Sequence, residues 1–194
     1  ALVRALAINP SVLLMDEPLS NLDRELRLNV RTEIVSLLKK LKITTLIVSH
    51  DTEDALAISD RIIVLEKGMI SQIGSPLEVF NTPKNCHVAL LFGQSNFIPI
   101  DNLKKKHKYF ILNEKNEKVI SVRPSQLKIV NELALDDDFF FEGSIINICL
   151  LGLHKQLTIK CKQFVVNVNL SNLKDAIIGE KVKVVFKKNF FRYN

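Results

Sequence analysis

The sequence contains no tryptophan and only three cysteines, Cys86, Cys149 and Cys161. Their wide, irregular spacing gives neither a disulfide framework nor a zinc-ligand pattern, and free thiols suit a reducing cytosol. No apolar run approaches the ~18 residues that a membrane-spanning helix needs. We therefore expect a chain that does not cross a membrane and is not held together by disulfides.

Charge is distributed unevenly along a composition that is otherwise typical of globular proteins. Hydrophobic residues make up 47% and charged residues 25% of the 194 residues, which excludes disorder. Residues 1–93 hold 10 Lys and Arg against 11 Asp and Glu, whereas residues 94–194 hold 17 against 10. This asymmetry predicts two domains, 1–93 and 94–194, with the boundary near Gly93.

Residues 1–93 alternate between helical and strand patterns. Apolar residues at steps of three and four predict an amphipathic helix over 24–41. The apolar runs 12–15 and 44–48 predict strands covered on both faces. Strands alternating with helices predict a parallel α/β sheet. The other predicted elements are helices over 1–8, 51–59 and 82–93, a hairpin over 61–73 with its turn at Lys67-Gly68, and a capping box at 75–78.

Residues 94–194 change to short β-type runs separated by polar or glycine turns. A weak helical pattern over 170–177 is the exception. Many short, closely spaced strands predict a small barrel or sandwich. The predicted strands are 109–112, 119–122, 127–130, 139–149, 156–161, 164–170 and 182–186.

The candidate chemistry lies where two predicted strands end. Asp16 and Glu17 follow the run 12–15, and parallel sheets bind ligands at the carboxyl ends of their strands. One carboxylate there can hold Mg²⁺ on phosphate oxygens, and the next can orient a water. A strand that merely ends in an acidic turn is the plainer alternative.

A histidine follows the second strand in a matching position. His50 could reach the same phosphate as Asp16, although a lone histidine is more often structural. Ser20 and Asp23 lie before the helix over 24–41, and either could simply cap it.

These residues resemble a family. In order and spacing, residues 15–18, 19–23 and 49–51 are similar to the Walker B motif, D-loop and switch-histidine loop of ABC transporter ATP-binding subunits. The similarity extends through Asp60-Arg61-Ile62 and Lys67-Gly68 to Gly74-Ser75-Pro76. The resemblance implies that residues 1–93 are the C-terminal part of a P-loop NTPase-type parallel sheet domain.

The resemblance also implies roles for the candidate residues. Asp16 would coordinate Mg²⁺ through water, and Glu17 would act as general base on the water that attacks the γ-phosphate of ATP. His50 would contact that phosphate. Ser20 and Asp23 would line the ATP site at the interface with a second copy of the subunit.

One part of the family pattern does not occur in the sequence. Walker A, G-x-x-x-x-G-K-[ST], supplies the phosphate cradle, and neither it, the Q-loop nor the Gly-rich signature is found. In the family all three precede the helix that residues 1–8 resemble. We therefore expect an N-terminally truncated subunit that does not hydrolyse ATP alone.

The second half resembles the small OB-like TOBE barrel of importers of the maltose, polyamine and ferric-iron type. The similar segments are 121–127, 141–146, 150–152 and 178–184, and residues 92–97 resemble the junction in iron and polyamine systems. The resemblance implies an ATPase on the cytoplasmic face of the membrane that energises uptake of ferric iron or polyamine. Its partners would be a second copy of the subunit, membrane permease subunits and, indirectly, an external solute-binding protein.

A different class of function remains open for residues 94–194. A basic barrel rich in phenylalanine could be a stand-alone module that binds a ligand or single-stranded nucleic acid. Its lysines cluster at Lys104-Lys105-Lys106 and Lys187-Lys188, near Phe190 and Phe191. Lysine runs between strands are usually solvated loops, and Phe139 to Phe141 fit a core, so we expect no nucleic acid. Asp136-Asp137-Asp138 is similarly interpreted as a solvated turn rather than a cation site.

Overall fold

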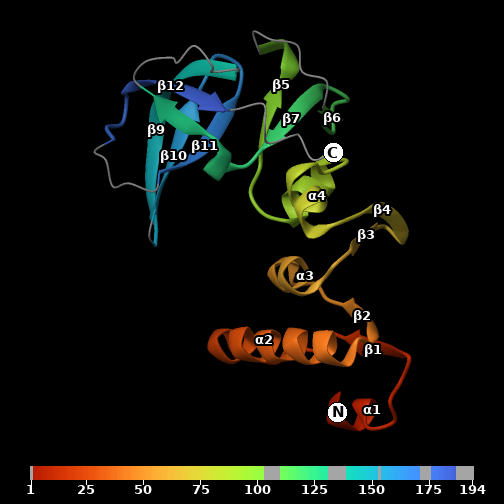
Figure 1. Cartoon of the computed structure of the whole chain (residues 1–194). Helices are drawn as coiled ribbons and strands as arrows, with labels where there is room; N and C mark the ends of the chain where they lie inside the picture. The colour runs from red at the N-terminus through yellow and green to blue at the C-terminus, as the bar shows by residue number, and fades with distance from the viewer. Residues whose placement is uncertain (1, 103–109, 131–138, 153, 171–175, 187–194) are drawn as a thin grey trace. The chain divides into compact units, whose positions relative to one another are not determined.

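The computed structural model describes residues 2–102, 110–130, 139–152, 154–170 and 176–186. By its contacts the chain divides into two compact units, Ala1–Ile62 and Ile63–Asn194. Figure 1 shows the order of the elements along the chain. The chain is mixed α/β, with a second unit rich in strands.

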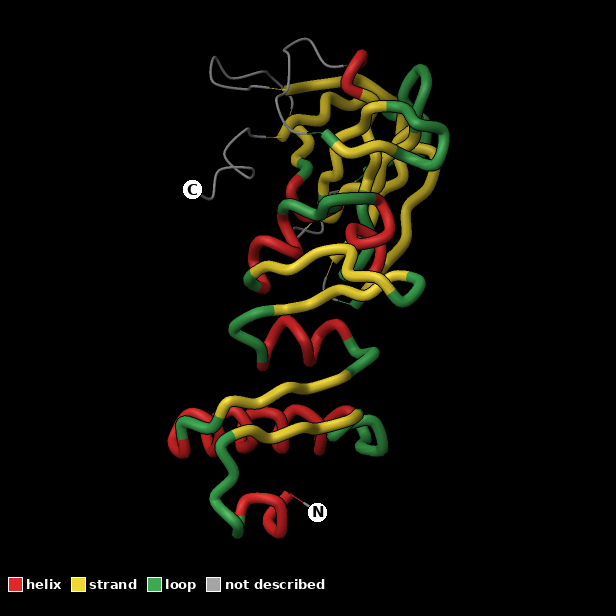
Figure 2. The backbone as a smooth tube through the Cα atoms, turned by 90° about the vertical axis from the view of Figure 1, so that its right-hand side faces the viewer, coloured by secondary structure: helices red, strands yellow, loops and turns green. Residues whose placement is uncertain are grey.

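The first unit is a small parallel α/β arrangement. Strands β1 and β2 pair in parallel from Val12↔Thr44 to Asp16↔Val48, and they run side by side in Figure 2. The two-stranded sheet confirms the predicted parallel pairing. Its elements are α1 (Leu2–Leu6), β1 (Val12–Asp16), α2 (Arg24–Leu41), β2 (Thr44–Val48) and α3 (Thr52–Ile58).

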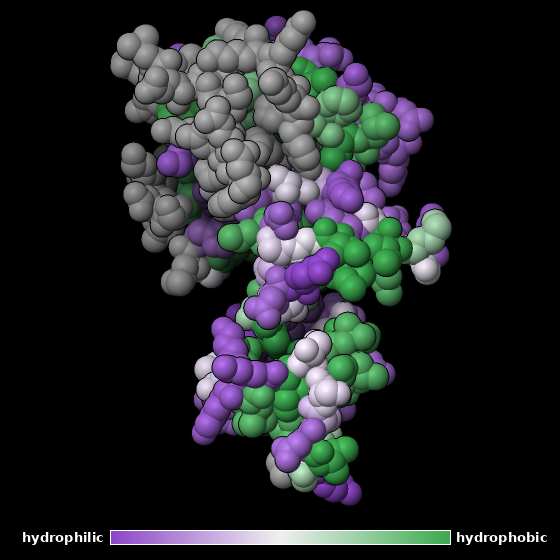
Figure 3. Space-filling model, turned by 45° about the vertical axis from the view of Figure 1, so that its right-hand side comes forward, coloured by the Kyte–Doolittle hydropathy of each residue, from purple (hydrophilic) through white to green (hydrophobic). Residues whose placement is uncertain are grey.

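The core of this unit lies on one face of the β1–β2 sheet. Leu13 and Met15 are buried there against Ile34 of α2 and Leu19 of the connecting loop. The opposite face carries four exposed apolar side chains, Val12 (52%), Leu14 (71%), Leu46 (53%) and Val48 (56%). The prediction that both strands are covered on both faces is therefore wrong for the described residues. The reason is that the helices of this unit place their apolar side chains against one face. Figure 3 shows hydrophobic side chains that remain on the surface.

A hairpin and two short helices begin the second unit. The turn at Lys67 (φ 52°) and Gly68 (φ 78°) has the two left-handed residues that a tight hairpin requires. The capping box is confirmed: Glu78 N–H donates to Ser75 Oγ over 3.3 Å, and Ser75 N–H donates to Glu78 Oε2 over 2.7 Å. The elements are β3 (Ile62–Glu66), β4 (Met69–Gly74), α4 (Pro76–Asn81) and α5 (Cys86–Leu91).

Helix α5 starts later than the Thr82-Pro83 dipeptide suggests. Asn85 caps it by accepting the Val88 N–H at 2.8 Å. An asparagine side chain can accept a hydrogen bond from an amide in the first turn of a helix, whereas a proline side chain has no acceptor. The predicted start of this helix is therefore early by about one turn, although its end before Gly93 is confirmed.

Two antiparallel sheets complete the second unit. One has the order β5-β7-β6 and the other β11-β10-β9-β12-β8. The strands are β5 (Asn96–Pro99), β6 (Ile111–Leu112), β7 (Lys118–Val122), β8 (Lys128–Val130), β9 (Phe139–Leu151), β10 (His154–Lys160), β11 (Val165–Leu170) and β12 (Lys181–Phe186). Seven of them were predicted, whereas β5 was not.

The two sheets share one hydrophobic core. Ile98 and Ile120 from the smaller sheet are buried with Phe139, Leu157 and Val184 from the larger one. Packing of this kind agrees with a small sandwich or barrel. The predicted helix over 170–177 falls largely outside the described residues. None of the helices that the structure describes has the length and apolar character to cross a membrane.

Candidate functional site

The candidate site lies at the carboxyl edge of the β1–β2 sheet. Asp16 is the last residue of β1 and pairs with Val48, the last residue of β2. The Glu17 N–H then donates to the Val48 carbonyl at 2.9 Å, which extends the pairing by one residue. The structure therefore brings Asp16, Glu17 and His50 to one edge, as the sequence predicted.

Glu17 and His50 are in direct contact. Glu17 Oε1 accepts the His50 backbone N–H at 3.0 Å and lies 2.6 Å from His50 Nδ1. Because an ionised carboxylate only accepts, Nδ1 carries the proton in this contact. Both interactions use Oε1, and Oε2 has no hydrogen-bond partner among the described residues. The histidine side chain is 76% exposed, so its other nitrogen can meet a ligand.

The backbone of Glu17 is held in an unusual conformation. Its φ of 47° lies in the left-handed region, which is uncommon for a residue with a side chain. Ser20 stabilises this turn because its hydroxyl and its backbone N–H donate to the Glu17 carbonyl at 3.0 and 3.3 Å. Strained residues cluster at functional sites where the surrounding structure over-determines them. The turn directs the Glu17 side chain toward His50.

Asp16 is exposed at the strand end. No hydrogen bond or ion pair to its side chain occurs among the described residues, so its oxygens are available. Carboxylate oxygen is the ligand that Mg²⁺ prefers, and this ion often takes only one or two carboxylates and completes its shell with water and phosphate. A cluster of three or more His, Cys, Asp or Glu side chains that could hold a metal is not found in the described part of the chain.

Asp23 has a structural role at the start of α2. Its Oδ1 accepts the Leu26 N–H at 2.9 Å and so caps α2. No hydrogen bond or ion pair joins the Asp23 side chain to the other candidate residues in the described ranges. The capping alternative is therefore confirmed, and any further role for Asp23 stays a prediction.

Two ion pairs that the sequence did not predict join α2 to α3. Arg27 contacts Asp51 at 2.5 Å, and Arg31 contacts Asp54 at 2.6 Å with both side chains largely buried. Asp51 also caps α3, because its Oδ1 accepts the N–H groups of Glu53 at 2.9 Å and Asp54 at 3.2 Å. The Arg27–Asp51 ion pair thus ties Asp51, the residue after His50, to α2, the helix that follows Asp23.

The pKa of Asp51 is lowered from its ordinary value of 3.8. Partial burial acts in the opposite direction, but the amide hydrogen bonds from Asp54 and Glu53 and the charges of Arg27 and Arg31 outweigh it. An N-cap signal was present in the sequence, since an aspartate directly precedes Thr52-Glu53. Its arginine partner is distant in sequence and gave no signal.

The sequence is similar to those of known import ATP-binding proteins. The chain is 39% identical over 172 residues to the spermidine/putrescine import ATP-binding protein PotA of Mesoplasma florum, covering 82% of this chain and 48% of that protein. It is 34% identical over 194 residues to PotA of Clostridium novyi, covering 94% and 55%. The chain belongs to the ATP-binding subunits of ABC importers. Within this family it is also 50% identical over 99 residues to the Fe(3+) ions import ATP-binding protein FbpC 2 of Rhizobium meliloti, covering 51% and 25%.

The chain spans about half the length of most of these ABC importer relatives. No protein-family model matches it. Among solved structures, the cytoplasmic molybdate-binding protein ModG is similar with a TM-score of 0.32 and 12% identity, covering 48% of this chain and 89% of that one.

Proposed function

We propose that this chain is part of the ATP-hydrolysing subunit of an ABC importer, with Asp16, Glu17 and His50 in its ATPase site. The observation that carries the proposal is the Glu17–His50 contact at the shared end of two parallel strands. Relatives named as import ATP-binding proteins support it.

In this proposal Glu17 activates water through its second oxygen. His50 occupies Oε1, and this leaves Oε2 to accept a proton from a water molecule. As that proton leaves, the water oxygen bonds to the γ-phosphorus of ATP and the bond between this phosphorus and the ADP oxygen breaks. Phosphate and ADP are the products. Reactions of this type depend mainly on positioning and on neutralising charge, and a carboxylate fixed by two contacts suits that task.

His50 and Asp16 would act on the charge of the phosphates. An imidazolium donates from both ring nitrogens, so His50 can bridge the Glu17 carboxylate and a γ-phosphate oxygen. Asp16, which is exposed and has no side-chain partner among the described residues, would hold Mg²⁺ through water. When bound, that ion neutralises charge on the phosphate oxygens.

Partners and solute follow from family membership and are part of the proposal. Ser20 and Asp23 would face a second copy of the subunit, and the pair of subunits would dock under membrane permease subunits at the cytoplasmic face. An external solute-binding protein would act through the permease. Relatives named for spermidine/putrescine and for Fe(3+) import favour a polyamine or ferric iron as the solute. Residues 94–194, which form the larger part of the second unit, would be the TOBE-like barrel, with the domain boundary near Gly93.

A second candidate is a stand-alone basic module without ATPase activity. The excess of Lys and Arg in residues 94–194 favours it, since they number 17 against 10 acidic residues. However, Phe139, Phe141 and Phe186 are buried in the core, so these rings offer no surface on which bases could stack. The clusters Lys104-Lys105-Lys106, Lys187-Lys188, Asp136-Asp137-Asp138 and the pair Phe190-Phe191 lie outside the described residues.

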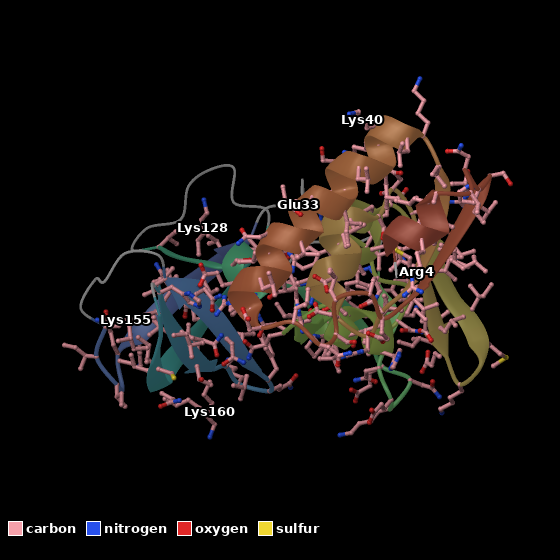
Figure 4. The ribbon with its side chains drawn as sticks, turned by 90° about the horizontal axis from the view of Figure 1, so that it is seen from below. Arg4, Glu33, Lys40, Lys128, Lys155 and Lys160 are labelled. Atoms are coloured by element: carbon pink, nitrogen blue, oxygen red, sulfur yellow. The ribbon has the colours of Figure 1, made fainter. Side chains whose placement is uncertain are left out.

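The test is ATP hydrolysis by a full-length importer subunit that contains this chain. We expect Glu17→Gln to reduce turnover at least ~100-fold while ATP-dependent dimerisation persists, because general-base catalysis contributes on this order. His50→Ala should also lose most activity. Glu33→Gln is the matched control for charge, since Glu33 is exposed on α2 and labelled in Figure 4. His87→Ala controls for removal of an exposed histidine.

The outcomes separate the two candidates. Near-normal hydrolysis by Glu17→Gln would overturn the assignment of Glu17 as base, and unchanged turnover by His50→Ala would leave His50 a structural residue. The chain by itself contains no Walker A sequence, and we expect it to show no hydrolysis. Hydrolysis by the chain alone that Glu17→Gln does not affect would contradict the proposed site.

A further inference from the structure

The outer face of the five-stranded sheet carries a hollow that the proposed ATPase role does not use. Its volume is about 590 Å³, within the range of small-molecule sites. Strands β9, β10 and β12 and the turn after β10 form it. The lining residues that matter here are Lys160, Lys162, Lys181, Lys183, Glu142 and Ser144.

Strand register places the lysines around a central serine. Ser144 on β9 pairs with Lys160 on β10 and with Lys181 on β12. Paired residues point to the same face, and neighbouring strands lie ~4.8 Å apart, so the two lysines flank Ser144 with their Cα atoms roughly 10 Å from each other. Lys183 and Glu142 form the next pair on this face. Figure 4 shows Lys160 extending outward from the sheet.

The charges around the hollow are unbalanced. Four ammonium groups face one carboxylate, and none of the four forms an ion pair with an acidic side chain in the described part of the chain. Cys161 also lines the hollow, but burial raises the pKa of its thiol to about 11, so it adds no negative charge at neutral pH. Like charges this close repel one another, and an anion bound between them would relieve that repulsion.

The wall of the hollow is closely packed at Gly143. A Cβ at this position would lie 2.6 Å from Ile159 Cγ2 and 2.8 Å from the Lys160 carbonyl oxygen. Only glycine therefore lets β9 and the end of β10 approach this closely. The approach fixes the backbone of Lys160 beside Ser144, so Lys160 projects from the sheet, as do Lys181 and Lys183, whereas Lys162 follows in the turn after β10.

We propose that this hollow binds a small oxyanion with two or more negative charges, of the phosphate or polyphosphate class. Lysine ammonium groups bind phosphate as point charges, and the Ser144 hydroxyl adds a hydrogen-bond donor. Among the described residues no aromatic ring lines the hollow, so this part of the chain offers no surface there that would stack a nucleobase. This site goes beyond the ATPase role, since it uses none of the residues at the β1–β2 edge.

The test is binding of inorganic pyrophosphate to the whole chain by calorimetry. We expect saturable binding that the double variant Lys160→Gln/Lys181→Gln weakens at least ~10-fold, because each lost ammonium removes a direct charge contact. The matched control is Lys128→Gln/Lys155→Gln, which removes the same charge from the same sheet. Neither of these lysines lines the hollow, and Figure 4 shows both well apart from Lys160. Circular dichroism checks that all variants fold.

Several results would overturn the proposal. If both double variants weaken pyrophosphate binding equally, pyrophosphate is attracted only by the net charge of the chain. If binding is not saturable at low salt, the hollow is not a binding site. A single-stranded oligonucleotide that binds more tightly than pyrophosphate and depends on Lys160 and Lys181 would replace the small anion with nucleic acid. The assay needs no ATP hydrolysis, so its failure leaves the proposed ATPase function untouched.

Discussion

The guanidinium of Arg123 stacks on the ring of Phe80, with Cζ 4.4 Å from the ring centroid, and donates to the Phe80 carbonyl at 3.0 Å. It also donates to the carbonyls of Ala89 at 2.7 Å, Gly93 at 2.8 Å and Gln94 at 3.3 Å. Burial lowers the pKa of Arg123 to about 10, so it remains charged at neutral pH. One side chain at the end of β7 thus holds α4, α5 and the segment after them.

Replacing Arg123 should destabilise the second unit strongly. Arg123→Met leaves buried carbonyls without donors, and we expect a loss of about 3 kcal/mol in the free energy of unfolding. Arg123→Lys should cost less, because an ammonium restores the charge but cannot reach all four oxygens. Urea unfolding and hydrogen exchange of the α5 amides measure the effect. Lys118→Met is the control, since this exposed cation lies over the Phe110 ring; an equal loss there would contradict the interpretation.

Asp51 stabilises the first unit in two ways that two variants can separate. Asp51→Ala removes both the α3 cap and the Arg27 contact, and we expect a loss of about 1–2 kcal/mol. Asp51→Asn keeps a capping oxygen, so it should lose less than about 1 kcal/mol, the value of a partly exposed ion pair. Hydrogen exchange of the Thr52–Ile58 amides reports on α3 directly. Asp60→Ala removes an exposed carboxylate as control, and equal losses in both Asp51 variants would exclude a capping role.

The lowered pKa of Asp51 also predicts a pH dependence. The folded unit favours the ionised carboxylate, so this contribution is complete above the ordinary pKa of 3.8. It is lost as the pH falls through the lower folded value, because the unfolded chain then takes up a proton more readily. Stability of α3 should therefore fall more steeply as the pH decreases below about 4 in the wild type than in Asp51→Asn. Parallel curves for the two proteins would contradict this assignment.

The sequence predicted the local features of the candidate site well. The positions of Asp16, Glu17 and His50 at strand ends could be predicted, because apolar runs and periodicity identify strands from a few adjacent residues. Pairing of β1 with β2 then follows, since consecutive strands joined by a helix run parallel. The Glu17–His50 contact could not be derived, because it depends on the left-handed backbone of Glu17 and on strand register.

Features that depend on packing between distant segments were less accessible. Arg123 stands in a segment recognised by resemblance, yet nothing local indicated that its guanidinium would be buried against four carbonyls. The β5 strand was missed because its pattern is short and ends in Pro99. The exposed face of β1 and β2 was also missed, since an apolar run shows that a strand can be covered without showing what covers it.

Asn96 joins the two sheets of the second unit and gives a further test of the buried core. Its Nδ2 donates to the Asn167 carbonyl at 2.9 Å, and its Oδ1 accepts the Asn167 N–H at 2.7 Å. Asn96→Asp keeps the acceptor but loses the donor and buries a charge, so we expect a loss of about 2–3 kcal/mol at neutral pH.

This cost should decrease on acidification. Burial raises the pKa of a carboxyl, and the protonated form can again donate to the Asn167 carbonyl. The folded pKa of the introduced group then exceeds its unfolded value, so stability should increase as the pH falls through the folded value. Urea unfolding from pH 7 toward pH 4 measures this, with Asn96→Ser as the control that lacks a titrating group. If the free energies of unfolding of the two variants change in parallel with pH, Asn96 does not make the two buried hydrogen bonds seen between β5 and β11.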